Sequence, residues 1–215
     1  MIKVFILGSK CNMSCKFCMS VERDLEKEVV VDNLLKMNPG DLAVFAGGEP
    51  LLYPNLGDFL KIAKSRGLRT KIHTNGVLLN RVNFLDLIDI VNLPLDGPKF
   101  VHDAMRANGH FDIVMDAFKK LSKQFTITTA LTKKNIEYID EIVKIINKLA
   151  ERRNILNWKI FKFKSKGRGS KYKDEFEISD EDFLSAINVA KAKSNIKIYA
   201  ITDPDAMKTE VIRKL

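Results

Sequence analysis

The chain has 215 residues and a mass of 24.4 kDa, a length that fits one domain with its own buried core. Its 36 lysine and arginine residues outnumber its 27 aspartate and glutamate residues, which gives a formal net charge of +9. No apolar run approaches the length of a membrane-spanning helix, so the composition excludes a protein with helical spans. We predict a single domain over residues 1–215.

The excess of positive charge does not by itself identify a partner. A nucleotide, an RNA or an acidic protein would each be attracted to such a surface, and a solvated, lysine-rich exterior explains the charge equally well. Lysine is frequent and Gln124 is the only glutamine, a bias closer to thermophilic proteins than to dedicated nucleic-acid binders. We therefore expect neither a nucleic-acid partner nor a membrane partner.

Strand-like runs of β-branched and aromatic residues alternate with longer amphipathic stretches, which is typical of βα units over a parallel sheet. The predicted strands are Ile2–Leu7, Leu42–Ala46, Leu68–His73, Ile90–Leu93, Phe125–Leu131 and Leu156–Phe163, followed by a short strand at Ile196–Ile201. The predicted helices are Val29–Met37, Leu56–Ser65, Phe111–Leu121, Ile136–Leu149 and Asp180–Ala190, with a short one at Val82–Leu87.

Six βα units in this length predict an α/β fold of the partial (β/α)6 barrel type, with right-handed crossovers. A complete eight-unit barrel typically needs about 250 residues. Ser165–Lys173, rich in glycine and lysine, is the one linker-like stretch. Because function in barrels of this kind collects at the C-terminal ends of the strands, the residues after each strand are the candidate site residues.

All three cysteines of the chain, Cys11, Cys15 and Cys18, fall within eight residues after the first predicted strand. Random placement would produce such a group roughly once in a few hundred chains, so scattered buried thiols are a poor explanation. Iron–sulfur clusters usually take four thiolates, and three would leave one iron open to a substrate. Zinc is the alternative, but no histidine is near in sequence, so a fourth ligand would have to come from afar.

Two short polar motifs follow the second and third predicted strands. Gly47-Gly48-Glu49-Pro50 comes directly after the second strand, where glycines let backbone groups approach a ligand closely. Thr74-Asn75-Gly76 follows the third strand. Taken alone, each motif also fits an ordinary turn, the second with glycine at positive φ.

Taken together, the Cys-x3-Cys-x2-Cys spacing and the Gly-Gly-Glu-Pro motif resemble the radical S-adenosylmethionine (SAM) superfamily, over most of the chain from Cys11 to about Phe183. The resemblance implies that the three cysteines hold a [4Fe–4S] cluster whose open iron binds SAM. It implies reductive cleavage of SAM to methionine and a 5′-deoxyadenosyl radical, which abstracts hydrogen from a substrate. The absence of cysteines after Cys18 argues against subfamilies with auxiliary clusters.

The resemblance also implies which residues contact SAM. Gly47, Gly48 and Glu49 would bind its amino group, and Thr74 and Asn75 its ribose or carboxylate.

Two further residues have a structural alternative. Phe17 occupies the position that packs near the adenine in relatives, with a core aromatic as the alternative. The segment from Leu93 through Arg106 resembles the branch that includes molybdenum cofactor biosynthesis protein A, where an arginine reaches the SAM carboxylate. Arg106 is the candidate because a guanidinium can hold a carboxylate with two hydrogen bonds, and a solvated surface arginine is the alternative.

The sixth predicted strand carries the candidate substrate residues, Lys159 and Lys162. Strand alternation places Lys159, Phe161 and Phe163 on one face and Lys162 on the other. If the first face lines the barrel, Lys159 needs an anionic partner, although it could also snorkel to solvent. The segment resembles the viperin family of nucleotide dehydratases, in which a matching lysine helps bind a triphosphate.

Several functions stay open at this point. The substrate could be a small anion such as a nucleotide, or a peptide or partner protein. Glycyl-radical activases fit the size, but their fourth strand usually carries an Asp-x-Lys-like motif, and Asp96-Gly97-Pro98 lacks the lysine. An iron–sulfur protein for electron transfer or sensing is a different class, which would not cleave SAM.

The cellular setting is also an expectation. The N-terminus leads at once into a strand-like segment, with no room for a signal peptide, so we expect a cytoplasmic, reducing compartment. The electron donor implied by the resemblance is a ferredoxin or flavodoxin.

Overall fold

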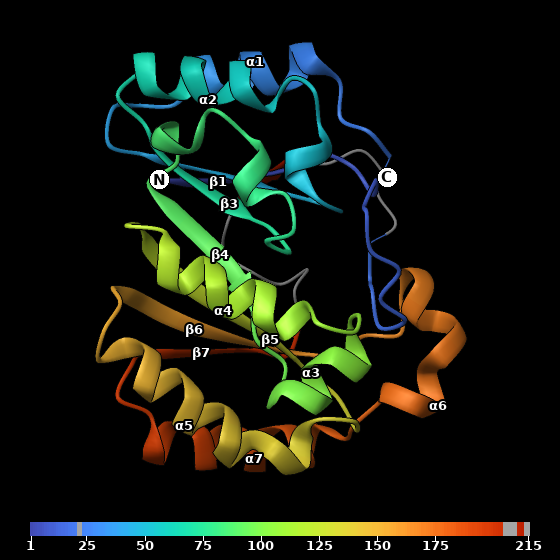
Figure 1. Cartoon of the computed structure of the whole chain (residues 1–215). Helices are drawn as coiled ribbons and strands as arrows, with labels where there is room; N and C mark the ends of the chain where they lie inside the picture. Colours follow the sequence, from blue (N-terminus) through green and yellow to red (C-terminus); the bar gives the residue numbers. More distant parts are fainter. Residues whose placement is uncertain (21–22, 204–209, 213–215) are drawn as a thin grey trace. The chain divides into compact units, whose positions relative to one another are not determined.

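The computed structural model describes residues 1–20, 23–203 and 210–212, in which strands and helices alternate along the chain (Figure 1). The described chain divides into two compact units. The first contains residues 1–12, 20, 23–92 and 210–212, and the second contains residues 13–19 and 93–203. Strand β4 (Ile90–Pro94) contributes residues to both units. The assignment of residues 1–215 to a single domain stays a prediction.

The first unit is a parallel sheet in the order β8-β1-β2-β3-β4. Its other elements are strands β1 (Ile2–Ile6), β2 (Leu42–Ala46), β3 (Arg69–His73) and β8 (Glu210–Ile212), helices α1 (Lys27–Leu35) and α2 (Leu56–Ser65), and the 3₁₀ turns η1 (Pro50–Leu52), η2 (Leu79–Arg81) and η3 (Leu85–Leu87). Phe5 and Phe45 are register partners, and Phe45 stacks on Phe59 of α2 with ring centroids 6.3 Å apart. Helix α2 therefore packs on one face of this sheet, and it lies beside α1 (Figure 1).

The second unit continues from β4 in the order β4-β5-β6-β7. Its strands are β5 (Gln124–Leu131), β6 (Ile155–Lys162) and β7 (Ile198–Ile201), its helices are α3 (Lys99–Met105), α4 (His110–Lys120), α5 (Ile139–Ala150), α6 (Lys173–Phe176) and α7 (Asp180–Lys193), and its 3₁₀ turns are η4 (Ile136–Tyr138) and η5 (Gly167–Tyr172). Helices α5 and α7 lie side by side (Figure 1).

Strand β6 shows the predicted alternation. Trp158 and Ile160 are fully buried, and the Trp158 indole N–H donates to the hydroxyl of Thr129 over 2.8 Å. Lys159 and Phe161 are only half-buried, so they lie on the opposite face of the strand. No helix in the described residues is long and apolar enough to cross a membrane.

Two expectations about secondary structure are wrong, and three short elements were not predicted. Val82–Leu87 is not a helix, because Val82 is extended (φ −106°, ψ 144°) between the turns η2 and η3. Helices α3 and α6 and strand β8 were not predicted, since they are only seven, four and three residues long. Ser165–Lys173 is not a free linker, because it contains η5.

Candidate functional site

The turn after β2 holds the backbone that leads into the cysteine motif. The amides of Gly48 and Glu49 donate to the carbonyls of Gly8 and Lys10 over 2.7 and 2.8 Å. A Cβ on Gly48 would lie 2.2 Å from the Lys10 carbonyl oxygen, and Gly47 has φ +133°. Both positions therefore require glycine, because the chain here passes close to the backbone of Gly8 and Lys10. This packing accounts for the two glycines without a bound ligand.

Glu49 ties the end of β2 to the end of β3. Its side chain is fully buried and accepts three hydrogen bonds, from the Thr74 hydroxyl (2.7 Å), the Asn75 amide (2.7 Å) and the Leu51 amide (3.1 Å). Burial raises the pKa of Glu49 above its ordinary value, although the three donors act in the opposite direction. The carboxylate thus positions two strand-end loops.

Asn75 reaches the first cysteine. Its side-chain amide donates to Asn12 Oδ1 over 2.8 Å and to Cys11 Sγ over 3.8 Å. Its own Oδ1 accepts the Val77 amide, and Gly76 has φ +88°, so the segment is the predicted glycine turn. Hydrogen bonds to cysteine sulfur are one of the levers that set iron–sulfur potentials.

In the second unit, Phe17 packs into a core cluster with Val101, Met105, Phe163 and Phe176. It is 7% exposed and meets Phe176 edge-on, with ring centroids 5.9 Å apart. Cys15 is partly buried against the same cluster. The structure therefore gives Phe17 the packing role of its alternative interpretation, and contact with an adenine stays a prediction.

Arg106 is not a solvated surface residue. Its side chain is 14% exposed and forms an ion pair through Nε with Asp96, which is fully buried. The guanidinium also lies over the Phe17 ring, 5.2 Å from its centroid. Burial lowers the pKa of Arg106, but the charge and hydrogen bond of Asp96, together with the nearby Cys15 and Cys18, outweigh it and raise the pKa overall. Contact of Arg106 with SAM stays a prediction.

A buried network, which the sequence did not reveal, holds Asp96 in place. Its Oδ1 accepts the Ala130 amide over 2.8 Å, and its amide donates to His102 Nδ1 over 3.1 Å. His102 Nε2 in turn lies 2.8 Å from His110 Nδ1. Burial lowers the pKa of His102 to about 3, which keeps the ring neutral and its Nδ1 available as an acceptor. The segment around His102 carries several polar residues in sequence, but nothing there indicated this pairing.

The two candidate substrate lysines lie on opposite faces of β6. Lys162 pairs with Asp180 over 2.7 Å on the Trp158 face. Lys159 makes no hydrogen bond or ion pair within the described chain. Burial lowers its pKa, and the neighbouring Tyr199 on β7 partly opposes this.

A second polar group lies on the Lys159 face of β6. Asn157, two residues before Lys159, has a buried side-chain oxygen without a hydrogen-bond partner in the part of the chain that the structure describes.

The donor chemistry of the cysteine motif fits an iron–sulfur cluster. None of the three cysteines forms a disulfide; Cys11 is exposed and the other two are partly exposed. Soft thiolates are the ligands that such clusters take. Among the described residues, no group of three or more His, Cys, Asp or Glu side chains is arranged to hold a single metal ion.

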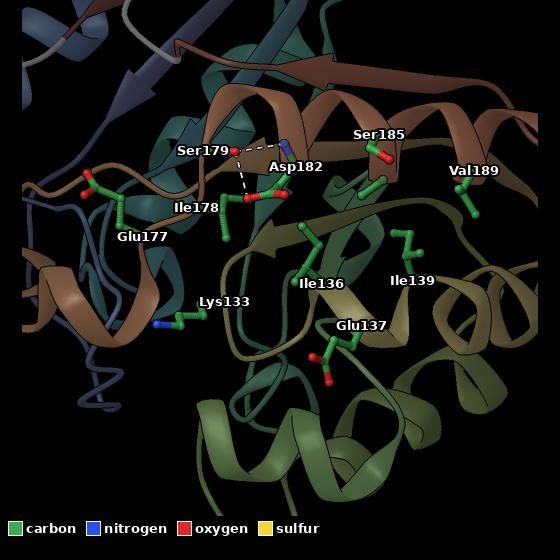
Figure 2. A pocket seen from close by; sticks show the side chains of 11 residues that line it. Lys133, Ile136, Glu137, Ile139, Glu177, Ile178, Ser179, Asp182, Ser185 and Val189 are labelled. Carbon is green, nitrogen blue, oxygen red and sulfur yellow. Dashed lines mark hydrogen bonds between the residues drawn. The ribbon is translucent and has the colours of Figure 1, made fainter.

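A cavity of about 570 Å³ lies in the second unit, near the N-terminal ends of α5 and α7 (Figure 2). Ile136, Ile139 and Ile178 supply apolar lining, and the Ser179 hydroxyl caps α7 by accepting the Asp182 amide over 2.9 Å (Figure 2). None of the predicted site residues lines this cavity, so the cavity and the candidate site share no residue.

The family of the chain follows from comparison with known proteins. A family model described as the radical SAM superfamily matches residues 5–149. The chain belongs to the radical SAM superfamily, whose members use SAM and a [4Fe–4S] cluster. The finer assignment to the branch of molybdenum cofactor biosynthesis protein A stays a prediction.

Two curated relatives have different activities. An S-adenosylmethionine-dependent nucleotide dehydratase from Lacinutrix mariniflava is 28% identical, over 93% of this chain and 48% of its own length. Mycofactocin maturase MftC from Mycobacterium tuberculosis is 26% identical, over 74% of this chain and 44% of its own length. The chain spans about half the length of these relatives.

The fold also has solved counterparts. SuiB from Streptococcus suis, in its S-adenosylmethionine complex, matches with a TM-score of 0.74 at 16% identity, over 94% of this chain and 51% of that chain. The structure described as TYW1 with a lysine-pyruvate adduct matches with a TM-score of 0.58 at 19% identity, over 90% of this chain and 72% of that chain. The predicted partial (β/α)6 barrel of the radical SAM type is thereby confirmed.

Proposed function

We propose that this chain is the core of a radical SAM enzyme in which Cys11, Cys15 and Cys18 hold the [4Fe–4S] cluster. The observation that carries the proposal is the spacing of three cysteines, the only ones of the chain and none of them in a disulfide, in a member of this superfamily. When bound, the cluster and SAM supply a 5′-deoxyadenosyl radical that abstracts hydrogen from a substrate. The electron donor we propose is a ferredoxin or flavodoxin in the cytoplasm.

The protein's own residues would support this chemistry by holding groups in place. Glu49 fixes the turns after β2 and β3, and Asn75 donates to the Cys11 sulfur. In the second unit, Asp96 holds Arg106 through Nε, which leaves the two terminal nitrogens for an anion such as the SAM carboxylate. Gly47, Gly48 and Thr74 would complete the SAM contacts.

The test of this proposal is reductive SAM cleavage by anaerobically reconstituted protein. We expect about four irons per chain, a [4Fe–4S] signal on reduction, and slow formation of 5′-deoxyadenosine without substrate. Stoichiometric zinc with no iron uptake would contradict the cluster. Protein that holds its cluster and binds SAM without ever cleaving it would favour an electron-transfer or sensor protein instead.

For the substrate we propose a small anion, of which a nucleotide is one example. The support is Lys159, a half-buried ammonium without an ion-pair partner in the described chain. A buried lysine is costly unless an anion compensates it. The similarity to a nucleotide dehydratase over 93% of the chain points to the same class.

Lys159→Ala is expected to abolish stimulation of 5′-deoxyadenosine formation by phosphorylated metabolites. Lys162→Ala is the matched control, because Lys162 already pairs with Asp180 on the other face and its loss should leave the stimulation intact. Since burial lowers the pKa of Lys159, the anion should bind more weakly as pH rises through that lowered pKa. The measurement is product formation against pH in both variants. Equal responses of wild type and Lys159→Ala would contradict an anionic substrate at this position.

A peptide or protein substrate is the second candidate. It is favoured by the similarity to a mycofactocin maturase and by the fold of SuiB, which has been solved bound to the precursor peptide SuiA. Stimulation of SAM cleavage by peptides, with no response to phosphorylated compounds, would support this candidate over the anionic one.

A further inference from the structure

We propose that η5 (Gly167–Tyr172) is a strap that holds the cysteine loop by its backbone and so controls how firmly the cluster is retained and how easily it is reduced. The inference rests on the proposed function, since it concerns the cluster that Cys15 and Cys18 would ligate. It replaces the expectation that this glycine- and lysine-rich stretch is a linker.

Two hydrogen bonds join the strap to the two cysteines. The Gly169 amide donates to the Cys18 carbonyl over 2.9 Å, and Arg168 Nη1 donates to the Cys15 carbonyl over 3.2 Å. Gly169 is buried although Arg168 and Ser170 on either side are exposed, so the strap points into the protein at this residue. Both carbonyls belong to predicted cluster ligands, and fixing them restricts the backbone from which each thiol projects.

The strap passes so close to the loop that only glycine fits at position 169. A Cβ there would lie 2.9 Å from the Phe163 ring and 3.3 Å from the Phe17 carbonyl oxygen. The Phe163 ring is only 3% exposed and is packed in the core cluster, so it has little room to yield. The close packing of the strap against the cysteine loop therefore requires a residue without a Cβ at position 169.

The residues before and after the strap pack in the same cluster as Phe17, the aromatic residue between the cysteines. Phe163 precedes the strap and Phe176 follows it, and both pack in one cluster with Phe17. The ring centroids of Phe176 lie 5.9 Å from Phe17 and 5.7 Å from Phe163. The chain on both sides of the strap thus packs in the cluster that contains Phe17, while the strap itself bonds to the Cys15 and Cys18 carbonyls.

Surface contacts continue the same attachment. Lys16, between Cys15 and Phe17, pairs with Glu175 over 3.4 Å and lies 5.1 Å from the centroid of the Tyr172 ring. Such exposed contacts are weak one by one. They nevertheless add to the hydrogen bonds and the aromatic packing, because every one of them joins the cysteine loop to the chain between Arg168 and Phe176.

The strap has two separable effects on a bound cluster. Fixing the loop geometry should slow the loss of iron, as the partners that orient metal ligands generally do. The Arg168 charge should favour the reduced cluster, which is the more negative state, and hydrogen bonding and charge both tune such potentials. Arg168 is therefore a positioning residue that acts through the backbone of Cys15.

The experiment compares four variants of the reconstituted full chain: Gly169→Ala, Arg168→Ala, Arg168→Lys and the control Lys171→Ala. Lys171 is an exposed cation in the same strap, with no bond to the cysteine loop in the described structure. We measure the rate at which a ferrous chelator removes iron, and the midpoint potential of the cluster by redox titration.

Gly169→Ala and Arg168→Ala should lose iron about 10-fold faster than wild type, while Lys171→Ala should match wild type. The potential should become more negative in Arg168→Ala and stay near wild type in Arg168→Lys, which keeps the charge. If Arg168→Ala and Gly169→Ala hold their full iron content and release it at the wild-type rate, the role of the strap is contradicted while the proposed function stands. If Gly169→Ala does not fold, the iron release rate of Arg168→Ala tests the proposal, because Arg168 is exposed and its replacement should not disturb folding. Absence of iron uptake in wild type would instead defeat the proposed function, and the strap with it.

Discussion

Cys15→Ala should leave the chain folded but without its cluster, and should lower 5′-deoxyadenosine formation by more than about 100-fold. Loss of a residue that merely orients a metal ligand already costs about 10- to 100-fold, so removal of a ligand should cost more. The fold should survive, because the bond from Arg168 is made to the Cys15 carbonyl, which alanine keeps. The measurements are iron content, the visible absorption of the cluster and product formation under reducing conditions.

Ser14→Ala is the matched control for this prediction, because Ser14 is an exposed residue within the same motif. It should retain its iron and its activity. Denaturant unfolding of the apo forms separates folding from ligation, since both variants should unfold at the wild-type midpoint. Full cluster retention in Cys15→Ala would contradict the assignment of this cysteine as a ligand.

The sheet was largely predictable from the sequence because its strands are buried on both faces or on one, and so they read as apolar or alternating runs. Leu42–Ala46 and Leu56–Ser65 have the predicted bounds. Elements that depend on distant contacts were missed. Strand β8 is three residues long and pairs with β1, more than 200 residues earlier, so its local sequence carries little signal.

The candidate site was predictable where chemistry requires a rare residue in a fixed order, as with the three cysteines and Gly47-Gly48-Glu49-Pro50. Hydrogen-bond partners were not predictable. Glu49 was expected to face a ligand, yet its carboxylate accepts three protein donors, two of them from residues about 25 positions later. Asp96 shows the same difficulty, since its burial and its partners Arg106 and Ala130 arise only when the sheet assembles.

The strap shows why composition alone misled. Glycine and lysine are common in flexible linkers, and Ser165–Lys173 has that composition. At Gly169, however, glycine serves close packing against Phe163 and Phe17, which is a tertiary requirement. A single residue of this kind has the same identity in a linker and in a packed contact, so only the structure separates the two.

Arg106→Ala is expected to lower the free energy of unfolding of the apo protein by about 3–5 kcal/mol, the cost of leaving a buried charge without its partner. Asp96 is fully buried, and without Arg106 its carboxylate keeps, among the described residues, only the hydrogen bond from the Ala130 amide. Lys99→Ala is the control, because Lys99 begins helix α3 and Arg106 directly follows its end. Lys99 and Asp112 are 58% and 61% exposed, so loss of that pair should leave the free energy of unfolding near the wild-type value.

The double variant Asp96→Asn with Arg106→Ala separates charge burial from lost packing. Because it removes the carboxylate along with the guanidinium, it should be more stable than Arg106→Ala alone, as measured by urea unfolding. Equal stability of the single and double variants would show that the carboxylate is not the source of the cost.

The same arginine gives a second readout for SAM. Under conditions where Arg106→Ala is shown to be folded and to hold its cluster, SAM binding should weaken by about 1.5–3 kcal/mol, the scale of hydrogen bonds to a charged group. Equilibrium binding of SAM measures this. Arg106 would then be both the counter-ion of Asp96 and a ligand of the SAM carboxylate, two roles that its Nε and its terminal nitrogens can fill together. Unchanged SAM affinity in the folded variant would show that Arg106 is the counter-ion of Asp96 and not a ligand of SAM.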